Sequence, residues 1–193
     1  MKPKEGRIKE LLRERGLDGA ILSSPENFHY VTGFGGHQHT VSRQPGFTLA
    51  VMRSDDKAPT HITTMDFEAA TFRIKSAGLG FVVDPYDTWV GLKTWPEISQ
   101  GAVLPDKTRM ESSADKLEQF VKACDLADKR IGVEMDYLTV PYYNMICEKF
   151  PEAQLVDISD LFVYARSIKT EEEIQMFRKL CRIADHGFTQ VSR

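Results

Sequence analysis

The fold of this chain is decided by one segment, Gly19-Ala20-Ile21-Leu22-Ser23-Ser24-Pro25-Glu26-Asn27-Phe28-His29-Tyr30-Val31-Thr32-Gly33. Its first four residues form a short apolar run, which predicts a buried strand. Ser24 and Pro25 then supply an N-cap and a first-turn proline, so a brief helix should follow and end near Gly33. A strand that leads directly into a helix is typical of an α/β domain.

The alternation of strand and helix patterns continues on both sides of this segment. Short apolar runs predict further strands at 47–52, 61–65, 79–83, 131–134 and 155–156. Apolar residues at helical spacing predict helices at 7–15, 66–76, 113–126, from 139 onward and at 158–164. A region rich in proline and glycine, residues 85–105, predicts a long loop. The sequence therefore predicts an α/β fold in which helices flank a mixed β-sheet.

The last stretch of the chain predicts a helix with a wide apolar face. It begins Arg166-Ser167-Ile168-Lys169-Thr170-Glu171-Glu172-Glu173-Ile174, in which Thr170 and Glu173 have the spacing of a capping box. The apolar residues of the helix share about half of its circumference: Ile174, Met176, Phe177, Leu180, Cys181, Ile183, Ala184, Gly187, Phe188 and Val191. No stop signal follows, so we expect residues 1–168 to form one domain and residues 169–193 to be the first helix of a truncated second domain.

Composition and charge argue against several classes of partner. Hydrophobic residues at 41% and charged residues at 27% are ordinary globular values. A formal net charge of −3 gives no general attraction to nucleic acid or to anionic lipid. No apolar run approaches the length of a membrane span, and the first residues lack a signal-peptide core. We therefore expect no nucleic-acid partner, no membrane partner and a cytoplasmic location.

The cysteines point to the same compartment. Cys124, Cys147 and Cys181 are odd in number and widely spaced, which favours free thiols over disulfides. Cys124 and Cys181 lie on the apolar faces of predicted helices, so we expect both to be buried.

A glycine-rich segment, Gly33-Phe34-Gly35-Gly36-His37-Gln38-His39-Thr40, contains a first candidate site. If the segment is extended, His37 and His39 point to the same side and could share a metal ion. No cysteine or carboxylate lies near them in sequence, however, and the glycines do not match a phosphate-binding loop. Exposed histidines without a ligand role are therefore the favoured interpretation.

Carboxylates at the ends of predicted strands form a second candidate site. Asp66, Asp84, Glu134, Asp136 and Asp157 could hold Mg²⁺ for phosphodiester cleavage if several of them met at one edge of the sheet. Acidic residues after strands more often form turns or cap helices, and the chain has no basic patch. A nuclease stays open as an alternative. Patterns typical of a serine nucleophile are absent.

Arg43 is a third candidate. It lies in Val41-Ser42-Arg43-Gln44-Pro45-Gly46-Phe47, the loop before the predicted strand at 47–52. We expect that strand to pair with the one at 61–65 as a hairpin across the turn-rich residues 53–59. The guanidinium of Arg43 is a planar fork of N–H donors that fits a carboxylate. A solvated surface arginine is the competing interpretation, and it is what we expect in the isolated chain.

These motifs resemble the creatinase, prolidase and aminopeptidase P family. Ser24 to Phe34 is similar to its P-x-N-x-x-Y-L-[ST]-G-F segment. The stretches Ile131-Gly132-Val133-Glu134 and Leu155-Val156-Asp157-Ile158 lie where the family has its I-G-V-E and L-V-D strands. The stretch from Arg166 to Ile174, followed by Arg178, Ala184 and Gly187, resembles the family's R-x-I-K-[ST]-x-x-E-I…R-x-A…A…G junction. The resemblance covers essentially the whole chain.

The resemblance implies a ribonuclease H-like N-terminal domain followed by a pita-bread catalytic domain. In the family, that second domain holds two Asp, one His and two Glu, which bind two metal ions in the peptidases, while creatinase has a metal-free site. No residue of this chain matches one of those ligands. We therefore expect no catalytic residue and no cofactor here, and a divalent pair (Mn, Co or Zn) would belong to the missing domain.

The resemblance also implies a role in a homodimer. In creatinase-like members, an arginine of the N-terminal domain reaches the partner subunit's active site and binds the substrate carboxylate. Arg43 matches that position, although Val41 replaces the preceding aromatic residue. We expect Arg43, and more weakly His39 and His37, to bind substrate in this way.

The expected function is that of the N-terminal domain of a creatinase or Xaa-Pro peptidase type C–N bond hydrolase, acting on a short peptide or small molecule. This domain would serve dimerisation and shape the partner subunit's active site. The alternative is a non-catalytic pita-bread homologue that binds peptides or proteins.

Overall fold

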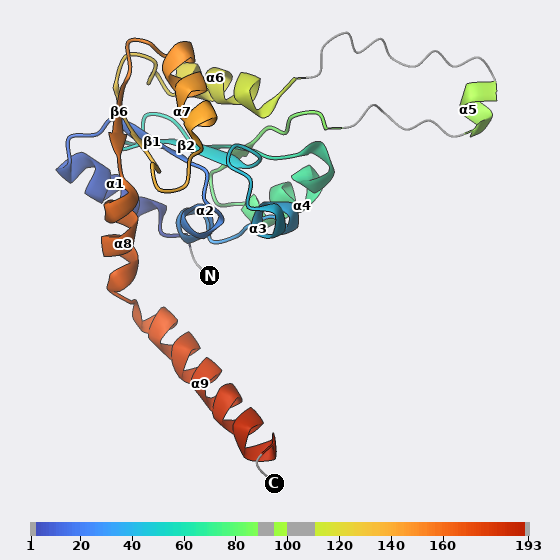
Figure 1. The fold of residues 1–193 in the computed structure, drawn as a ribbon, viewed down its shortest axis with the longest axis vertical. Coiled ribbons are helices and arrows are strands. Elements are labelled where there is room, and N and C mark those ends of the chain that lie inside the picture. The colour runs from blue at the N-terminus through green and yellow to red at the C-terminus, as the bar shows by residue number, and fades with distance from the viewer. Residues whose placement is uncertain (1–2, 89–94, 100–110, 192–193) are drawn as a thin grey trace. The chain divides into compact units, whose positions relative to one another are not determined.

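The computed structural model describes residues 3–88, 95–99 and 111–191. The chain forms two compact units, Met1–Ser159 and Asp160–Arg193. The first unit is built on a six-stranded sheet of order β4-β3-β2-β1-β5-β6. Its strands are β1 (Gly19–Leu22), β2 (Leu49–Arg53), β3 (His61–Thr63), β4 (Val82–Val83), β5 (Arg130–Val133) and β6 (Gln154–Asp157). Figure 1 labels strands β1, β2 and β6.

The sheet is mixed, as predicted. Strand β2 pairs antiparallel with both β1 and β3, which confirms the predicted hairpin of β2 and β3. The pairs β1–β5, β5–β6 and β3–β4 are parallel. The strand predicted at 79–83 shortens to β4, because Gly78 and Gly80 have positive φ angles of 76° and 79° and turn the chain before it.

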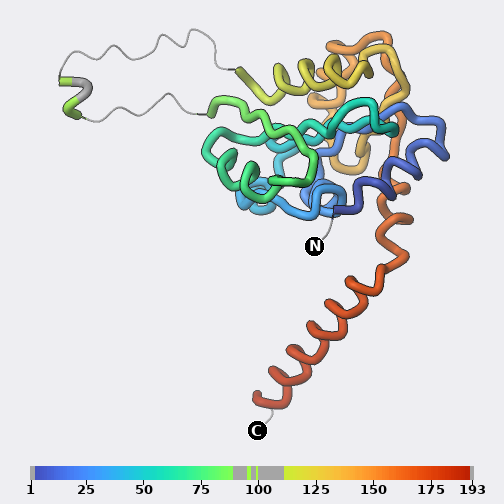
Figure 2. Tube along the Cα trace, turned by 180° about the vertical axis from the view of Figure 1, so that it is seen from behind, coloured from blue at the N-terminus to red at the C-terminus, as the bar shows by residue number. Residues whose placement is uncertain are grey.

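Helices cover both faces of this sheet. They are α1 (Glu5–Glu14), α2 (Pro25–Thr32), α3 (His37–Ser42), α4 (Asp66–Ser76), α6 (Ser113–Ala123) and α7 (Val140–Lys149). Helices α6 and α7 lie on one face, and α1, α2 and α4 lie on the other (Figure 1, Figure 2). A further short helix, α5 (Trp95–Ser99), lies in the predicted long loop, most of which is outside the described residues. The predicted fold class, a mixed α/β sheet flanked by helices, is confirmed.

Two apolar layers hold the sheet between the helices. On the α6–α7 side, Phe120 and Ile146 belong to the same buried cluster as Ile21 of β1 and Val51 of β2. Successive strand residues point to opposite faces, so Ala20 and Leu22 face the other layer, where Phe28 and Phe72 are fully buried. Because both faces are covered, the strands are apolar on both sides, as in other sheets of this kind.

The second unit contains all of α9 (Glu171–Val191) and most of α8 (Ser159–Ser167). The predicted capping box of α9 is confirmed, since the Thr170 N–H donates to Glu173 Oε2 at 2.7 Å and the Glu173 N–H donates to Thr170 Oγ1 at 3.4 Å. No residue of α9 is buried, and Phe188 is 78% exposed. Among the described helices, none combines the length and the apolar character that crossing a membrane requires.

The cysteines divide between the two units. Cys124, at the end of α6, is buried as predicted, and burial raises its pKa to about 11. Cys181, on α9, is exposed, so the prediction of a buried thiol is wrong there. The reason is that the apolar face of a helix buries its residues only where another element covers it.

Candidate functional site

A buried glutamate lies where two parallel strands end. Glu134 directly follows β5, and Ser23 and Ser24 directly follow its neighbour β1. Glu134 Oε2 accepts hydrogen bonds from the backbone N–H groups of Ser23 and Ser24, the latter at 2.9 Å. Oε1 accepts from Ser24 Oγ and from Asn27 Nδ2, both at 2.6 Å. Burial raises the pKa of Glu134, and these four hydrogen bonds oppose that shift by stabilising the ionised form.

Ser23 links this carboxylate to the segment that carries Arg43. The Ser23 carbonyl accepts a hydrogen bond from His39 Nε2 at 2.7 Å, and its hydroxyl accepts one from the Gly46 N–H at 2.9 Å. Gly46 has a φ of 86°, and a Cβ there would lie 2.2 Å from the ring of Tyr142, so glycine is required. The segment 39–46 is therefore attached to Ser23 at both ends.

Residues 37–42 form helix α3, so they do not form the extended segment that a shared metal site would need. The expectation that both histidines are exposed is wrong for His39. His37 is exposed, whereas His39 is buried and packs edge-on against Phe28, with the ring centroids 5.4 Å apart. The two imidazoles, two positions apart on a helix, do not face a common point. The helix forms here because a distant carboxylate, Glu68 of α4, accepts a hydrogen bond from the Gln38 N–H at 2.9 Å and so caps its first turn.

Arg43 ends α3 in the left-handed conformation, with φ 50° and ψ 33°. Its guanidinium binds the carboxylate of Glu26, on α2, with Nη1–Oε1 at 2.5 Å and Nη2–Oε2 at 3.2 Å. The Arg43 side chain is 51% exposed. It is thus a surface arginine, as expected, but one held by a carboxylate of its own chain.

The strand-end carboxylates do not converge. Asp84 binds Lys116 at 2.7 Å, Asp157 accepts from the Ser159 N–H at 2.9 Å, and Glu134 is enclosed by the donors described above. Within residues 3–88, 95–99 and 111–191, no three His, Cys, Asp or Glu side chains are grouped to hold a metal ion. The described residues therefore do not fit the metal pair that the resemblance implies for the family, nor a two-metal nuclease site.

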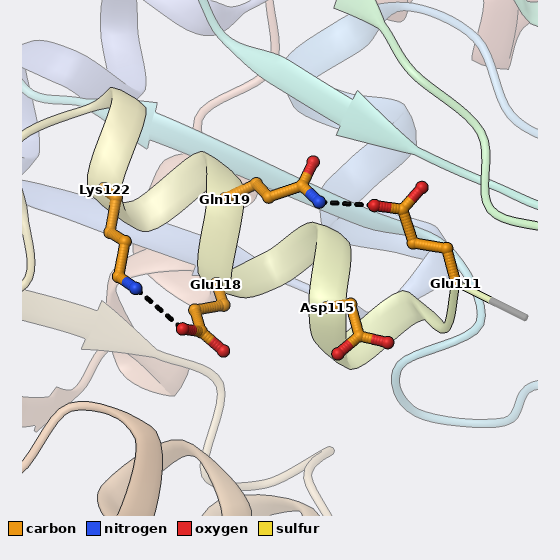
Figure 3. A pocket seen from close by; sticks show the side chains of 5 residues that line it. All are labelled: Glu111, Asp115, Glu118, Gln119 and Lys122. Atoms are coloured by element: carbon orange, nitrogen blue, oxygen red, sulfur yellow. Dashed lines mark hydrogen bonds and ion pairs between the residues drawn. The ribbon is translucent and has the colours of Figure 1, made fainter. Parts of the chain in front are cut away.

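A surface hollow along α6 is lined by polar and charged residues, Glu111, Asp115, Glu118, Gln119 and Lys122 (Figure 3). Glu118 binds Lys122 and Lys149, both at 2.7 Å, and these lysines lower its pKa to about 2. Asp115 forms a capping box with Ser112 at the start of the helix. Because these side chains satisfy one another, we interpret the hollow as a solvated helix surface.

Two contacts in and near the Arg43 region have no signal in the sequence. Glu26 is 17 positions from Arg43 and on a different helix, so no spacing rule connects them. Ser23 is 111 positions from Glu134, and only the parallel pairing of β1 and β5 brings them together. A buried apolar strand that ends in a glutamate is the one local hint that the carboxylate needs donors nearby.

With this fold and this arrangement in place, the class of protein is clear: residues 6–168 match the model of the Creatinase/Prolidase N-terminal domain, and the chain belongs to this family. It is similar to an Xaa-Pro dipeptidase of Lactobacillus delbrueckii subsp. lactis, 24% identical over 183 residues, covering 94% of this chain and 42% of the relative. It is also similar to a creatinase of Bacillus sp. (strain B-0618), 23% identical over 181 residues, covering 94% and 37%.

The fold is also found among solved structures. A dipeptidase from Pyrococcus horikoshii OT3 superimposes with a TM-score of 0.66 at 19% identity, covering 96% of this chain and 42% of that one. The chain spans 37–42% of the length of the curated relatives that it matches.

Proposed function

We propose that this chain is the N-terminal domain of a C–N bond hydrolase of the Xaa-Pro dipeptidase or creatinase type. Its family membership supports this, and so do its relatives, which continue well beyond the matched part. The domain serves dimerisation and shapes the active site of the partner subunit. The substrate is a short peptide or small amide with a free carboxylate, and the three free thiols suit the cytoplasm.

The fork contact of Arg43 is the observation that carries this proposal. Both Nη atoms bind a carboxylate while about half of the side chain stays open to solvent. A guanidinium is a planar fork of donors that fits a carboxylate, and we expect the open part of Arg43 to bind the substrate carboxylate in a neighbouring subunit. The role of His39 as a substrate contact stays a prediction. Its burial and its hydrogen bond to Ser23 favour a different role, which is to hold the Arg43 segment in place.

The gene sequence downstream of Arg193 tests the assignment to a hydrolase. A following pita-bread domain with two Asp, one His and two Glu in ligand positions would support a metallopeptidase. The same domain without those ligands would favour a creatinase-like enzyme or a non-catalytic peptide-binding homologue. A stop codon directly after Arg193 would contradict the proposal.

Kinetics of the full-length enzyme test the role of Arg43. Arg43→Ala should raise KM roughly tenfold or more, because a charged hydrogen bond to the substrate is lost. Arg43→Lys should restore only part of the affinity, since an ammonium cannot make the fork contact. Arg73→Ala removes another exposed arginine of the same domain and should behave as wild type. Unchanged kinetics for Arg43→Ala would return Arg43 to the role of a surface residue.

A further inference from the structure

We infer that Glu26 is a positioning residue for Arg43, which holds one edge of the guanidinium so that the other edge is presented to a substrate carboxylate. The inference rests on the function proposed above and adds a residue to it. It follows from the geometry of the ion pair, from the anchoring of both partners and from a second arginine in the same chain.

The ion pair leaves one edge of the guanidinium open. A guanidinium has five N–H donors in one plane, which form an edge between the two Nη atoms and another between Nε and Nη2. Glu26 binds the Nη1–Nη2 edge of Arg43. Within the described part of the chain, no hydrogen bond to Nε of Arg43 is found. A second carboxylate can therefore bind in the same plane without displacing Glu26.

Another arginine of this chain shows the contact that we expect on the open edge. Arg53 binds the carboxylate of Asp55 through Nε at 2.6 Å and through Nη2 at 2.9 Å. This is the side-on fork that Arg43 still has available. The two arginines together display both ways in which a guanidinium binds a carboxylate.

Both partners of the ion pair stand on backbone that is attached to one buried carboxylate. Helix α2, which carries Glu26, is fastened to Glu134 through Ser24 and Asn27. The segment that carries Arg43 is fastened to the same carboxylate through Ser23. The pair therefore differs from an ion pair between two freely moving surface side chains. In such a pair, the entropy lost on ordering the side chains offsets much of the favourable electrostatic energy.

Glu26 has two opposing effects on the affinity for a substrate carboxylate: it positions Arg43, and it repels the substrate. Glu26 carries a negative charge, which repels a second carboxylate, but both side chains of the pair are about half exposed, so water screens this effect. In contrast, Glu26 orders the long Arg43 side chain before the substrate binds, so binding does not carry that entropy cost. We therefore expect the net effect of Glu26 on substrate affinity to be favourable.

The test is a double-mutant cycle in the full-length enzyme, with the dipeptide Ala-Pro and with creatine as substrates. Glu26→Gln removes the charge but keeps the size of the side chain. We expect it to raise KM about three- to tenfold with kcat unchanged, because an interaction made equally in the ground and transition states is weakened. In the Arg43→Ala background, Glu26→Gln should have no further effect. Glu14→Gln removes an exposed charge on α1 and is the matched control.

The outcomes separate this inference from the proposed function. If Arg43→Ala raises KM while Glu26→Gln leaves it unchanged or lowers it, the positioning role is wrong and the function of Arg43 stands. If neither variant changes KM, Arg43 does not bind the substrate, and the inference about Glu26 falls with it. If neither substrate is hydrolysed, the proposed function itself is contradicted. NMR of the 193-residue chain gives an independent readout, in which the Nε–H of Arg43 should be ordered in the wild type and mobile in Glu26→Gln. Equal mobility in the two proteins would also overturn the inference.

Discussion

At the scale of single residues, the carboxylate of Glu134 holds the ends of two strands and the start of a helix together. Ser23, Ser24 and Asn27 all donate hydrogen bonds to it, and none of them contacts water freely. The task of this glutamate is explained by the donors that it satisfies. A role in holding metal is not needed to account for a carboxylate in this position.

Replacing Glu134 should be costly. Glu134→Ala leaves four buried donor contacts without an acceptor, so we expect the free energy of unfolding to fall by about 2–5 kcal/mol. Urea denaturation of the 193-residue chain measures this. Glu152→Ala, at an exposed position, should change stability by no more than about 0.5 kcal/mol. A loss for Glu134→Ala as small as that of the control would contradict the structural role.

His39 should make the stability of the domain depend on pH. Burial lowers its pKa below the usual value, and a proton on Nδ1 would have no acceptor within the described part of the chain. Below about pH 6.5 the unfolded chain therefore binds more protons than the folded one, and the free energy of unfolding should fall as the pH drops from about 7 to 5. Burial lowers the pKa of His29 and His61 in the same direction.

The contribution of His39 to the pH dependence of stability can be measured by substitution. His39→Gln keeps an N–H donor for the Ser23 carbonyl but cannot titrate. Urea denaturation at about pH 7, 6 and 5 should give a shallower pH slope for this variant than for the wild type. Identical slopes would show that His39 is not the group that titrates.

At the scale of elements, α9 is the one long helix with an apolar face that no described residue of its unit buries. Exposed apolar surface of this extent favours association. A chain that ends at Ile168 should keep the unfolding temperature of the first unit and should self-associate less in sedimentation experiments. Global unfolding of the shortened chain would show that the domain boundary predicted at 168 is wrong.

Elements with local signals could be predicted from sequence almost to the residue. The strand Gly19–Leu22 and the helix Asp66–Ser76 have the predicted bounds, because the apolar pattern of each lies within the segment itself. Helix α3 could not be predicted, because its first turn is capped by Glu68 from another helix. A helix of six residues has too few internal hydrogen bonds to form on local preference alone.

At the scale of the whole molecule, the 193-residue chain should not bind divalent metal ions tightly. The described residues bring no ligand group together, and the strand-end carboxylates are engaged with lysines or backbone N–H groups. Calorimetric titration with Mn²⁺, Co²⁺ and Zn²⁺ should give no stoichiometric site, and the chain alone should not cleave Ala-Pro or creatine. A one-to-one metal isotherm would contradict this expectation.

The sequence by itself determined the fold class, most of the strands and helices, the capping box at Thr170 and the family, because each depends on patterns within short segments. Only the tertiary structure decided which partners the site residues have. Arg43 meets Glu26 across 17 positions, Gln38 meets Glu68 across 30, and Ser23 meets Glu134 across 111. Such contacts form when the sheet and its helices pack, and the distances that matter for chemistry are set at that point.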